Sequence, residues 1–519
     1  MSRSLFGPFA SLEPVRTYFG EKSSAARMIC FEQRACVVSF ARWVLHNDVS
    51  RPAPSVHFCG DRLMSLPHFL ASLSLARLSA VVVCLGIPVG STATVGAAES
   101  VSVDSKNADV IWPQWRGGSQ QGVAPEGDYP VEWSEEKATR CKIPGSGAST
   151  PVIVGNRAFL TSGIDGQNHL LGVDIDSMEI AFQTPLGDDR GNKHRKGSGS
   201  NPSAVTNGKN VVAYFRSGDL ACCDLDGKPL WHTNLQEQFG EDTLWWDLGS
   251  SPMIVDNLVV VAVMQTGPSY IVAIDIESGE VVWKDDRMVP APEEAAQSYS
   301  TPLATEVDGK KVVAVLGADH LTLTDAKTGK RLGTLGGFNP GQEKFFRSIA
   351  SPVITGNVIV CPYSRGATLT GVDMAKLIEA GSDKNAADDA ILWMRDDVGS
   401  DVPTPAARDG IVYLISDGKQ SKGKLSALSA ETGETLWDTS LERTRSSYSS
   451  SPLVIGDRLY VTDESGTTSV LENIGGDSEP KLIHTNQVDD DEQFTVASPV
   501  PFSGGLLLRT KSHLYKLTR

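Results

Sequence analysis

The residues with the clearest chemical potential are two adjacent cysteines, Cys222 and Cys223, in the segment LACCDLDG. Neighbouring cysteines could form a vicinal disulfide. The segment aligns with IVAIDIES 51 residues later, where Ala273 and Ile274 take the same two places. Both segments have the pattern of a strand, in which successive side chains point to opposite faces, so a bond between them requires a distorted backbone. We therefore expect both cysteines to be buried packing residues.

Carboxylates and histidines are the other groups that could hold a metal or move protons. The acidic candidates are Asp247 in WWDLGSSP and the pair Asp491 and Glu492 in DDDEQFTVASP, and no recognisable ligand motif surrounds them. Neither a nucleophile elbow nor a phosphate-binding loop is present, and GTLGGFNPG is predicted to be a turn after a strand. The sequence therefore predicts no catalytic, cofactor-binding or metal-binding residues. The histidines after residue 98 also occur singly, without zinc spacing: His169, His194, His232, His320, His484 and His513.

A third group of residues is aromatic and basic, and it recurs in segments that precede Ser-Pro, Thr-Pro or Asn-Pro dipeptides. Examples are EDTLWWDLGSSP, QEKFFRSIASP and LERTRSSYSSSP. Enrichment in aromatic residues and arginine is typical of recognition surfaces. The candidate binding residues are Arg195, Trp245, Trp246, Tyr299, Phe345, Phe346, Arg347, Arg445, Tyr448 and Phe494.

The dipeptides recur with a nearly constant spacing of 47 to 53 residues, which indicates a radial repeat rather than several domains. Each proline is followed by an apolar run that a turn dipeptide divides, as in SPMIVDNLVVVAV, so two short strands joined by a tight turn are predicted. A third strand ending in Asp follows, and then a Thr-Gly or Ser-Gly turn and a fourth strand. The eight prolines are Pro151, Pro202, Pro252, Pro302, Pro352, Pro405, Pro452 and Pro499.

Four short antiparallel strands in each of eight units predict an all-β fold, an eight-bladed β-propeller. Only residues 374–390 could supply a helix, as an insertion in the fifth unit. The unit after Pro499 is too short for four strands. We expect its outer strand to come from VEWSEEKATRCKI near the N-terminal end of the repeats, because closing the ring removes free sheet edges. Residues 107–135, with WPQWRGG and Trp133, are expected to cross the outside before that strand.

In a propeller, the segments before the prolines connect one blade to the next and surround one mouth of the central channel. The aromatic and basic residues named above therefore come to one face. They are candidates for a ligand or partner site. The alternative is that the aromatic side chains plug the channel or cap the blade ends, since eight blades leave a wide axis to fill.

The first 98 residues differ from the rest in charge. They carry nine basic and five acidic side chains, a net charge of +4. Because the whole chain has a net charge of −16, residues 99–519 carry −20. From Met64 onward, an apolar run and a Val-Gly-Ala-Ala site have the layout of a secretory signal peptide. We expect translation to start at Met64 and the protein to be periplasmic or secreted. The acidic balance argues against a nucleic-acid partner.

These boundaries divide the chain into four parts. They are an upstream extension, a signal peptide, a lead-in segment and the propeller, at residues 1–63, 64–98, 99–132 and 133–519. The apolar run is short and is interrupted by Pro88 and Gly90, so no transmembrane span is expected in the mature protein. Four cysteines remain after the leader, too few for a disulfide scaffold.

The repeat pattern resembles the pyrroloquinoline-quinone (PQQ) repeat propellers, which include quinoprotein dehydrogenases and the outer-membrane assembly factor BamB. The resemblance rests on the Ser-Pro strands and on AIDIESGEVVW and SALSAETGETLW, and it covers about residues 111–519. The opening WPQWRGGSQQG is similar to that of a secreted, uncharacterised bacterial branch. The resemblance implies that one aromatic residue docks each blade on the next, and that units four, seven and eight, which lack it, are held less firmly. The docking residues are Phe182, Trp231, Trp283, Trp393 and Trp437.

Three functions stay open. The leading hypothesis is an exported, noncatalytic propeller that binds a protein, peptide or glycan partner through its mouth. The alternative is a PQQ-dependent quinoprotein oxidoreductase with a degenerate cofactor site, in which Cys222 and Cys223 would clamp the cofactor. A third is a hydrolase or lyase built on the mouth. Neither a calcium–PQQ motif nor a haem attachment sequence is present, so we expect no cofactor, with PQQ and calcium as the alternative.

Overall fold

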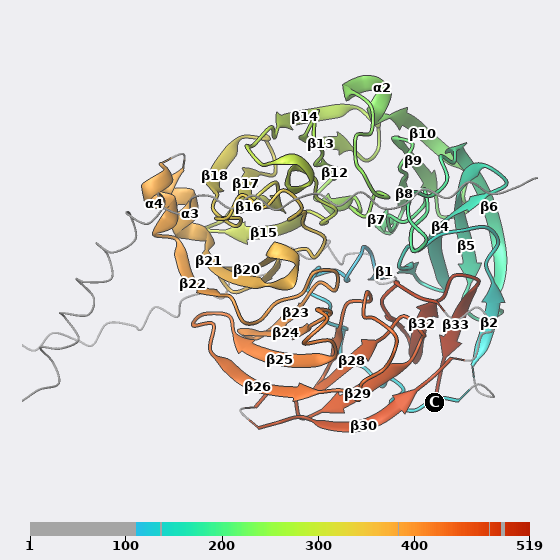
Figure 1. Cartoon of the computed structure of the whole chain (residues 1–519). Coiled ribbons are helices and arrows are strands. Elements are labelled where there is room, and N and C mark those ends of the chain that lie inside the picture. Colours follow the sequence, from blue (N-terminus) through green and yellow to red (C-terminus); the bar gives the residue numbers. More distant parts are fainter. Residues whose placement is uncertain (1–109, 135–137, 382, 477, 489–493) are drawn as a thin grey trace, which may run out of the picture. The chain divides into compact units, whose positions relative to one another are not determined.

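The computed structural model describes residues 110–134, 138–381, 383–476, 478–488 and 494–519. The upstream extension, the signal peptide and the first part of the lead-in segment lie outside the described residues, and so do Asp491 and Glu492. The described residues form eight antiparallel sheets around a central axis (Figure 1). The prediction of an eight-bladed β-propeller is therefore confirmed.

Blades 1 to 4 follow the first four repeats, and in each the lowest-numbered repeat strand lies nearest the axis. Blade 1 consists of β1 (Val110–Trp112), β3 (Val152–Val154), β4 (Arg157–Ile164), β5 (Gln167–Asp174) and β6 (Glu179–Asp188). Blade 2 consists of β7 (Val205–Thr206), β8 (Asn210–Tyr214), β9 (Asp219–Asp224) and β10 (Pro229–Asn234). Blade 3 consists of β11 (Met253–Val255), β12 (Leu258–Val263), β13 (Tyr270–Asp275) and β14 (Val281–Asp286). Blade 4 consists of β15 (Leu303–Val307), β16 (Lys310–Gly317), β17 (His320–Asp325) and β18 (Arg331–Leu335).

Blades 5 to 8 complete the ring. Blade 5 consists of β19 (Val353–Thr355), β20 (Val358–Tyr363), β21 (Thr368–Asp373) and β22 (Ile391–Arg395). Blade 6 consists of β23 (Ala406–Arg408), β24 (Ile411–Ile415), β25 (Lys424–Ser429) and β26 (Thr435–Ser440). Blade 7 consists of β27 (Leu453–Ile455), β28 (Arg458–Thr462), β29 (Thr468–Glu472) and β30 (Lys481–Asn486). Blade 8 consists of β31 (Val500–Phe502), β32 (Gly505–Arg509), β33 (His513–Leu517) and β2 (Thr139–Lys142).

The strand β2 closes the ring as expected. It lies in the segment VEWSEEKATRCKI and pairs antiparallel with β33, where Cys141 stands opposite Leu514. The last blade thus combines strands from both ends of the repeat region. Because β2 covers the edge of β33, blade 8 has four strands although its repeat supplies only three.

The repeated Asp-x-x-Ser/Thr-Gly pattern has a local explanation in the turn before each outer strand. In blade 3, Asp275 Oδ1 accepts hydrogen bonds from the backbone N–H groups of Glu277 at 3.0 Å and Ser278 at 2.8 Å. Gly279 then adopts a φ of +74°, a region that favours glycine. The carboxylate and the glycine together turn the chain back into β14.

The helical segments are short. The predicted insertion after Asp373 consists of two helices, and aspartate side chains cap both, since Asp373 accepts from the N–H of Lys376 and Asp383 from that of Asn385. A further helix, α2, follows β10, and there are two 3-10 turns, η2 between blades 3 and 4 and η3 between two strands of blade 5. Their bounds are α2 (Leu235–Phe239), α3 (Met374–Ala380), α4 (Lys384–Asp388), η2 (Glu293–Ala296) and η3 (Ser364–Gly366).

Aromatic residues of the outer strands contact the next blade. The indole of Trp283 in β14 donates from Nε1 to Ala326 O in blade 4 at 2.9 Å. A methyl group at Gly329 would lie only 2.7 Å from the Trp283 ring, so the turn glycine makes room for it. Phe182 lies over a turn glycine in the same way. Equivalent indole bonds join Trp231 to Ile276 O, Trp393 to Ala430 O and Trp437 to Ile474 O.

Blade 4 has Gly333 where its neighbours carry the aromatic residue. The inserted helix α3 covers this position, and a methyl group at Gly333 would lie 2.6 Å from Leu377 O. Leu377 and Met374 are both buried in the cluster between blades 4 and 5. The insertion therefore packs where other blades place a tryptophan.

The segment WPQWRGGSQQG does not cross the outside of the propeller, which corrects the expectation for most of residues 107–135. Residues 112–124, hereafter the central segment, lie along the axis beside the innermost strands. Only the part around Trp133 reaches an outer strand, where Asn486 Oδ1 in β30 accepts from the Trp133 N–H at 3.0 Å.

Hydrogen bonds link the central segment to the innermost strands of blades 1 to 7. Trp112 pairs with Ile153 of β3. In blade 7 the Ala124 N–H of the central segment also donates to Val454 O. Six further bonds run from an inner-strand N–H to an oxygen of the central segment. They join Thr206 to Pro113 O, Ile254 to Gln114 Oε1, Ala304 to Gln120 Oε1, Ile354 to Gln121 Oε1, Ala407 to Gln121 O and Val454 to Gly122 O. Buried N–H groups at a sheet edge require partners, which is the physical reason that a polar, glutamine-rich segment occupies the axis.

Candidate binding pocket at the propeller mouth

A ring of eight hydroxyl side chains surrounds the axis at one mouth. In seven units the hydroxyl residue precedes the repeat proline, and in the second unit, where Asn201 takes that place, Ser203 follows Pro202. The members are Thr150, Ser203, Ser251, Thr301, Ser351, Thr404, Ser451 and Ser498.

Each ring residue is hydrogen-bonded to the next one around the axis. The backbone N–H of each donates to the side-chain oxygen of the corresponding residue in the following blade, at 2.8 to 3.3 Å. The last bond, from Ser498 to Thr150, returns to the first blade. This geometry explains why a hydroxyl residue accompanies every repeat proline.

The ring hydroxyls line a cavity of about 510 Å³, a size typical of sites for small ligands. Trp115 of the central segment also lines it, and the Arg116 guanidinium lies 5.7 Å from the Trp115 ring centroid. The other charged or aromatic lining residues come from the blade connections and from η3: His194, Lys196, Trp246, Asp247, Tyr299, Arg347 and Arg365.

Trp246 and Arg347 converge on the buried carboxylate of Glu294. Trp246 Nε1 donates to Glu294 Oε1 at 2.8 Å, and Arg347 Nε lies 3.8 Å from the same oxygen. Arg347 also binds both carboxylate oxygens of Asp401, at 3.0 and 3.1 Å. The Arg347 side chain is thereby held in place on the pocket wall by two carboxylates.

Arg365 is the most weakly paired cation of the lining residues. Its side chain is 46% exposed, and its closest carboxylate oxygen, Glu294 Oε2, is 3.9 Å away. Lys196, by contrast, pairs with Glu464, which also accepts a hydrogen bond from Ser449. Arg365 can therefore reorient towards a ligand at small cost in existing contacts.

Asp247 is buried, and its oxygens are occupied. They accept hydrogen bonds from the backbone N–H groups of Lys193 and His194, both at 2.8 Å, and Arg216 Nη1 lies 3.4 Å away. The Asp247 carboxylate thus orders the connection that carries His194 and Lys196.

Comparison with known proteins identifies the family to which the chain belongs. The family described as outer membrane protein assembly factor BamB, which is built of PQQ repeats, matches residues 131–291, 263–376 and 382–479. The chain belongs to this PQQ-repeat family. No curated protein sequence matches the chain significantly.

Solved structures share the propeller fold. BamB from Moraxella catarrhalis is 17% identical with a TM-score of 0.52, and the match covers 75% of this chain and all of BamB. A europium-containing methanol dehydrogenase is 10% identical with a TM-score of 0.57, covering 80% of this chain and 99% of the enzyme. The quinohemoprotein alcohol dehydrogenase from Comamonas testosteroni is 12% identical with a TM-score of 0.53, covering 78% and 80%. At these identities the likeness concerns the fold alone.

The described residues of this PQQ-repeat propeller do not fit a calcium–PQQ pair. They contain no cluster of three or more His, Cys, Asp or Glu side chains that could hold a metal ion. Asp247, the acidic residue that lines the pocket, has its oxygens engaged by backbone amides. Calcium sites in proteins are built around carboxylate oxygens, and the described lining of this pocket supplies only the engaged carboxylate of Asp247.

Cys222 and Cys223 lie away from the pocket, in β9. Both are fully buried and unbridged, as expected for packing residues, and burial raises the pKa of each thiol to about 12. They therefore do not cover the pocket as a cofactor clamp would.

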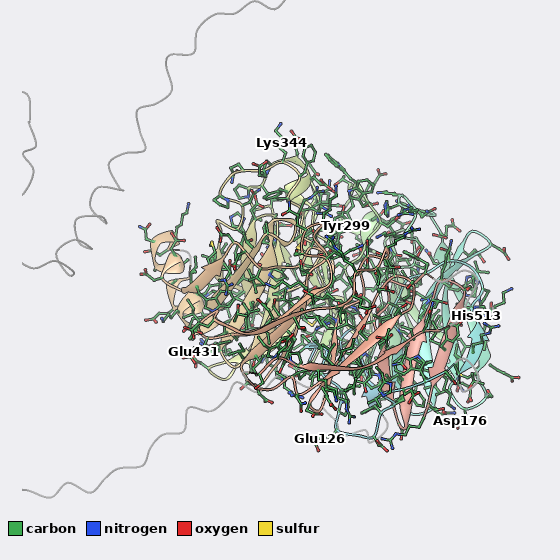
Figure 2. All side chains as sticks on the ribbon, turned by 60° about the horizontal axis from the view of Figure 1, so that its bottom comes forward. Glu126, Asp176, Tyr299, Lys344, Glu431 and His513 are labelled. Carbon is green, nitrogen blue, oxygen red and sulfur yellow. The ribbon has the colours of Figure 1, made fainter. Side chains whose placement is uncertain are left out.

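The structure brings only some of the predicted binding residues into the pocket. Trp246, Tyr299 and Arg347 line it. Trp245 and Phe345 are exposed beside it, with ring centroids 6.5 Å apart. In Figure 2, Tyr299 lies among neighbouring side chains, whereas Lys344, just before Phe345, projects from the edge.

The other predicted binding residues lie elsewhere. Arg195 and Phe494 line a smaller recess, and Phe346 is half-buried in its connection. Arg445 is exposed outside the pocket, and Tyr448 is buried in the core between blades 6 and 7. For Tyr448, the expectation that aromatic residues cap blade ends describes its position best.

Sequence reasoning missed the ring hydroxyls, Trp115, Lys196 and Arg365. The signal for the ring was present, since Ser or Thr stands next to all eight repeat prolines. Trp115 lies in a motif that was noted but placed outside the propeller. Arg365 has no signal of its own, because it belongs to η3, an irregular turn between two strands of blade 5.

Among the described residues, no helix is both long and apolar enough to cross a membrane.

Proposed function

We propose that this PQQ-repeat propeller is an exported, noncatalytic binding module that takes part of a protein, peptide or glycan partner into the pocket at its mouth. The pocket itself carries the proposal. It is a preformed cavity of about 510 Å³, its walls combine aromatic and arginine side chains, and eight blades hold its ring of hydroxyls in place. A preformed site loses little conformational entropy when it binds.

The pocket favours binding over covalent catalysis. A hydroxyl nucleophile needs a base within hydrogen-bond reach. In the described part of the chain, none of the eight ring hydroxyls is hydrogen-bonded to a histidine or a carboxylate. Ser449, which also lines the pocket, donates to Glu464, but that carboxylate is paired with Lys196. The Asp247 carboxylate is likewise occupied by amides. This arrangement supports the noncatalytic hypothesis over a hydrolase or lyase.

The proposed export rests on the sequence from Met64, which lies outside the described residues, and the family and its structural neighbours support an envelope location. We expect the exported protein to begin near residue 99. N-terminal sequencing of the protein recovered from the cell envelope or the medium measures this directly. Detection of residues 1–63 in that protein would overturn the proposal.

The partner site is tested with the double variant Trp246→Ala, Arg347→Ala. A pull-down from an envelope extract, together with a glycan array, covers the three partner classes. We expect the double variant to lose binding by about 30- to 1000-fold, the usual effect of removing interface anchors. The matched control is Met394→Ala with Lys481→Ala, which changes exposed residues of outer strands.

Arg347 is paired with the carboxylates of Glu294 and Asp401, so its loss could also destabilise the blade connections. Melting curves for each variant separate this effect from loss of binding. A second variant, Trp245→Ala with Phe345→Ala, removes an exposed aromatic pair beside the pocket without breaking an ion pair. Undiminished partner recovery by both stable variants would refute the mouth as the binding site.

A further inference from the structure

The ring hydroxyls of the mouth pocket keep hydrogen-bonding capacity for a ligand. Each ring hydroxyl accepts a backbone N–H, but within the described residues none of the eight donates its own proton to a protein acceptor. The nearby carboxylates are already used, since Asp247 binds two amides and Glu294 binds Trp246. Each ring hydroxyl therefore keeps its proton and one lone pair for a ligand, and the pocket suits a ligand that carries many oxygen atoms.

The charge around the pocket points in the same direction. Lys196, Arg347 and Arg365 line it together with a single carboxylate, that of Asp247, although the chain as a whole carries a net charge of −16. Arg347 is neutralised by Asp401 and Lys196 by Glu464, whereas Arg365 has only the long contact to Glu294. A cation left without a close partner at the mouth of a cavity is suited to an oxyanion.

A further cation lies behind Trp115. The Arg116 side chain is buried, and its three described acceptors are the main-chain carbonyl oxygens of Gln121, Pro405 and Pro452. These partners are uncharged, so the Arg116 charge is not cancelled locally. Because the low-dielectric interior screens it weakly, it adds positive potential beneath the pocket.

The remaining requirement is shape. The indole of Trp115 borders the cavity at the axis, and the ring hydroxyls encircle it. An indole surrounded by hydroxyl groups suits a ring with an apolar face and a polar edge, which is the form of a pyranose sugar. Hydroxyl groups of the ring can both donate to and accept from sugar hydroxyls.

We propose that the mouth pocket binds an acidic sugar, a pyranose that carries a carboxylate, phosphate or sulfate group. The sugar ring stacks on Trp115 and bonds to the ring hydroxyls, and Arg365 contacts the oxyanion. This inference rests on the proposed function of the mouth as a binding site, and it names the ligand's chemical class.

The test is calorimetric titration of the purified protein with four sugars that share one ring. Glucuronate, glucose 6-phosphate and glucose 6-sulfate present the three anionic groups, and glucose is the neutral control. We expect at least one acidic sugar to bind about tenfold or more tightly than glucose, and its identity distinguishes carboxylate, phosphate and sulfate. Inorganic phosphate and sulfate are titrated as free anions, and we expect them to bind more weakly than the acidic sugar.

The variant Arg365→Gln should weaken binding of the preferred acidic sugar by about 10- to 100-fold, the effect of losing a charged hydrogen bond. The matched control is Arg443→Gln, which changes an exposed arginine that does not line the pocket, and it should leave affinity unchanged. Arg365 is exposed and weakly paired, so its replacement is compatible with folding. Melting temperatures of both variants verify this.

Three results would overturn the inference: equal affinity for glucose and the acidic sugars, no binding of any of the four, or undiminished binding by Arg365→Gln. If free anions bind as tightly as the acidic sugars, the pocket is an anion site and the assignment of a sugar ligand is wrong. A partner captured through Trp246 and Arg347, with no binding of the four sugars, would overturn the sugar assignment alone and leave the proposed function in place.

Discussion

The backbone N–H of Ser498 donates to Thr150 Oγ1 at 3.3 Å, although 348 residues separate them in the chain. This bond completes the hydroxyl ring at the mouth, while β2 completes the last blade at the periphery. The propeller is therefore closed twice, at the axis by side chains and at the rim by a strand. The hydroxyl ring at the axis also lines the candidate ligand pocket.

The hydroxyl ring should contribute measurably to stability. Replacing Ser351 by Ala leaves the buried N–H of Thr301 without its acceptor, since that N–H donates to Ser351 Oγ at 2.8 Å. We expect a loss of about 1–3 kcal/mol in the free energy of unfolding, measured by chemical denaturation. The control is Ser351→Thr, which keeps the hydroxyl that Thr301 and Thr404 carry at the same ring position. If the alanine and threonine variants are equally stable, the ring bonds contribute nothing.

The central segment should be integral to the fold. The Gln120 amide is buried, accepting from the Ala304 N–H at 2.9 Å and donating to Pro302 O at 3.1 Å. Gln120→Ala leaves both backbone groups unpaired, and we expect it to cost about 2–4 kcal/mol. Denaturation midpoints measure this against Gln167→Ala, an exposed position in β5, for which a change within about 0.5 kcal/mol is expected. Similar midpoints for the two variants would show that residues 112–124 do not stabilise the inner strands.

The contact between Trp283 and Gly329 should hold blades 3 and 4 together. Trp283→Ala should cost about 3–5 kcal/mol in the free energy of unfolding, the usual range for a buried tryptophan. A denaturation midpoint equal to that of the unchanged protein would show that the ring is not needed for docking.

A pair of glycine variants isolates the same contact from backbone strain. Gly329 and Gly309 have nearly equal φ values of +72° and +74°, but a methyl group meets Trp283 only at Gly329 and meets nothing within 4 Å at Gly309. Gly329→Ala should therefore destabilise by about 1–3 kcal/mol more than Gly309→Ala. Equal losses of stability, measured by thermal denaturation, would show that the whole effect comes from backbone strain at a positive φ.

Stability should depend on pH through Asp417, which accepts the backbone N–H groups of Asp401 and Val402 beside the pocket. Burial raises the pKa of Asp417 to about 6, above its usual value of 3.8. Between about pH 4 and pH 6 the folded state therefore holds a proton that the unfolded state has lost, so stability falls as pH rises through this window and is level above it. The loss is roughly 3 kcal/mol.

The variant Asp417→Asn removes this titration and keeps a side-chain acceptor. We expect it to be more stable than the unchanged protein at pH 7 and to lack the Asp417 component of the slope between pH 4 and pH 6. Urea denaturation at four pH values measures both. Parallel pH profiles for the two proteins would show that Asp417 titrates at the same pH in the folded and unfolded states.

Most of the fold can be predicted from the local sequence pattern of the repeat. Pro252 and the apolar run after it predict β11 and β12, and the Asp275 to Gly279 turn predicts the step into β14. Such features depend on neighbours within a few residues, namely turn chemistry and alternating burial, so they can be predicted from one unit. Eight units in register then determine the ring, because each needs a neighbour to cover its apolar faces.

The set of residues that lines the pocket could not be predicted in the same way, because it depends on contacts between repeat units. Nothing near Trp115 in the sequence indicates that it borders the ring hydroxyls. Likewise, only the closed ring brings Trp246 and Arg347, about a hundred residues apart, to one carboxylate of Glu294. The sequence by itself determined the strands, the blade number and the hydroxyl residue beside each proline. The tertiary structure decided that residues 112–124 occupy the axis, because the inner-strand N–H groups that require partners there become neighbours only once all eight blades surround it.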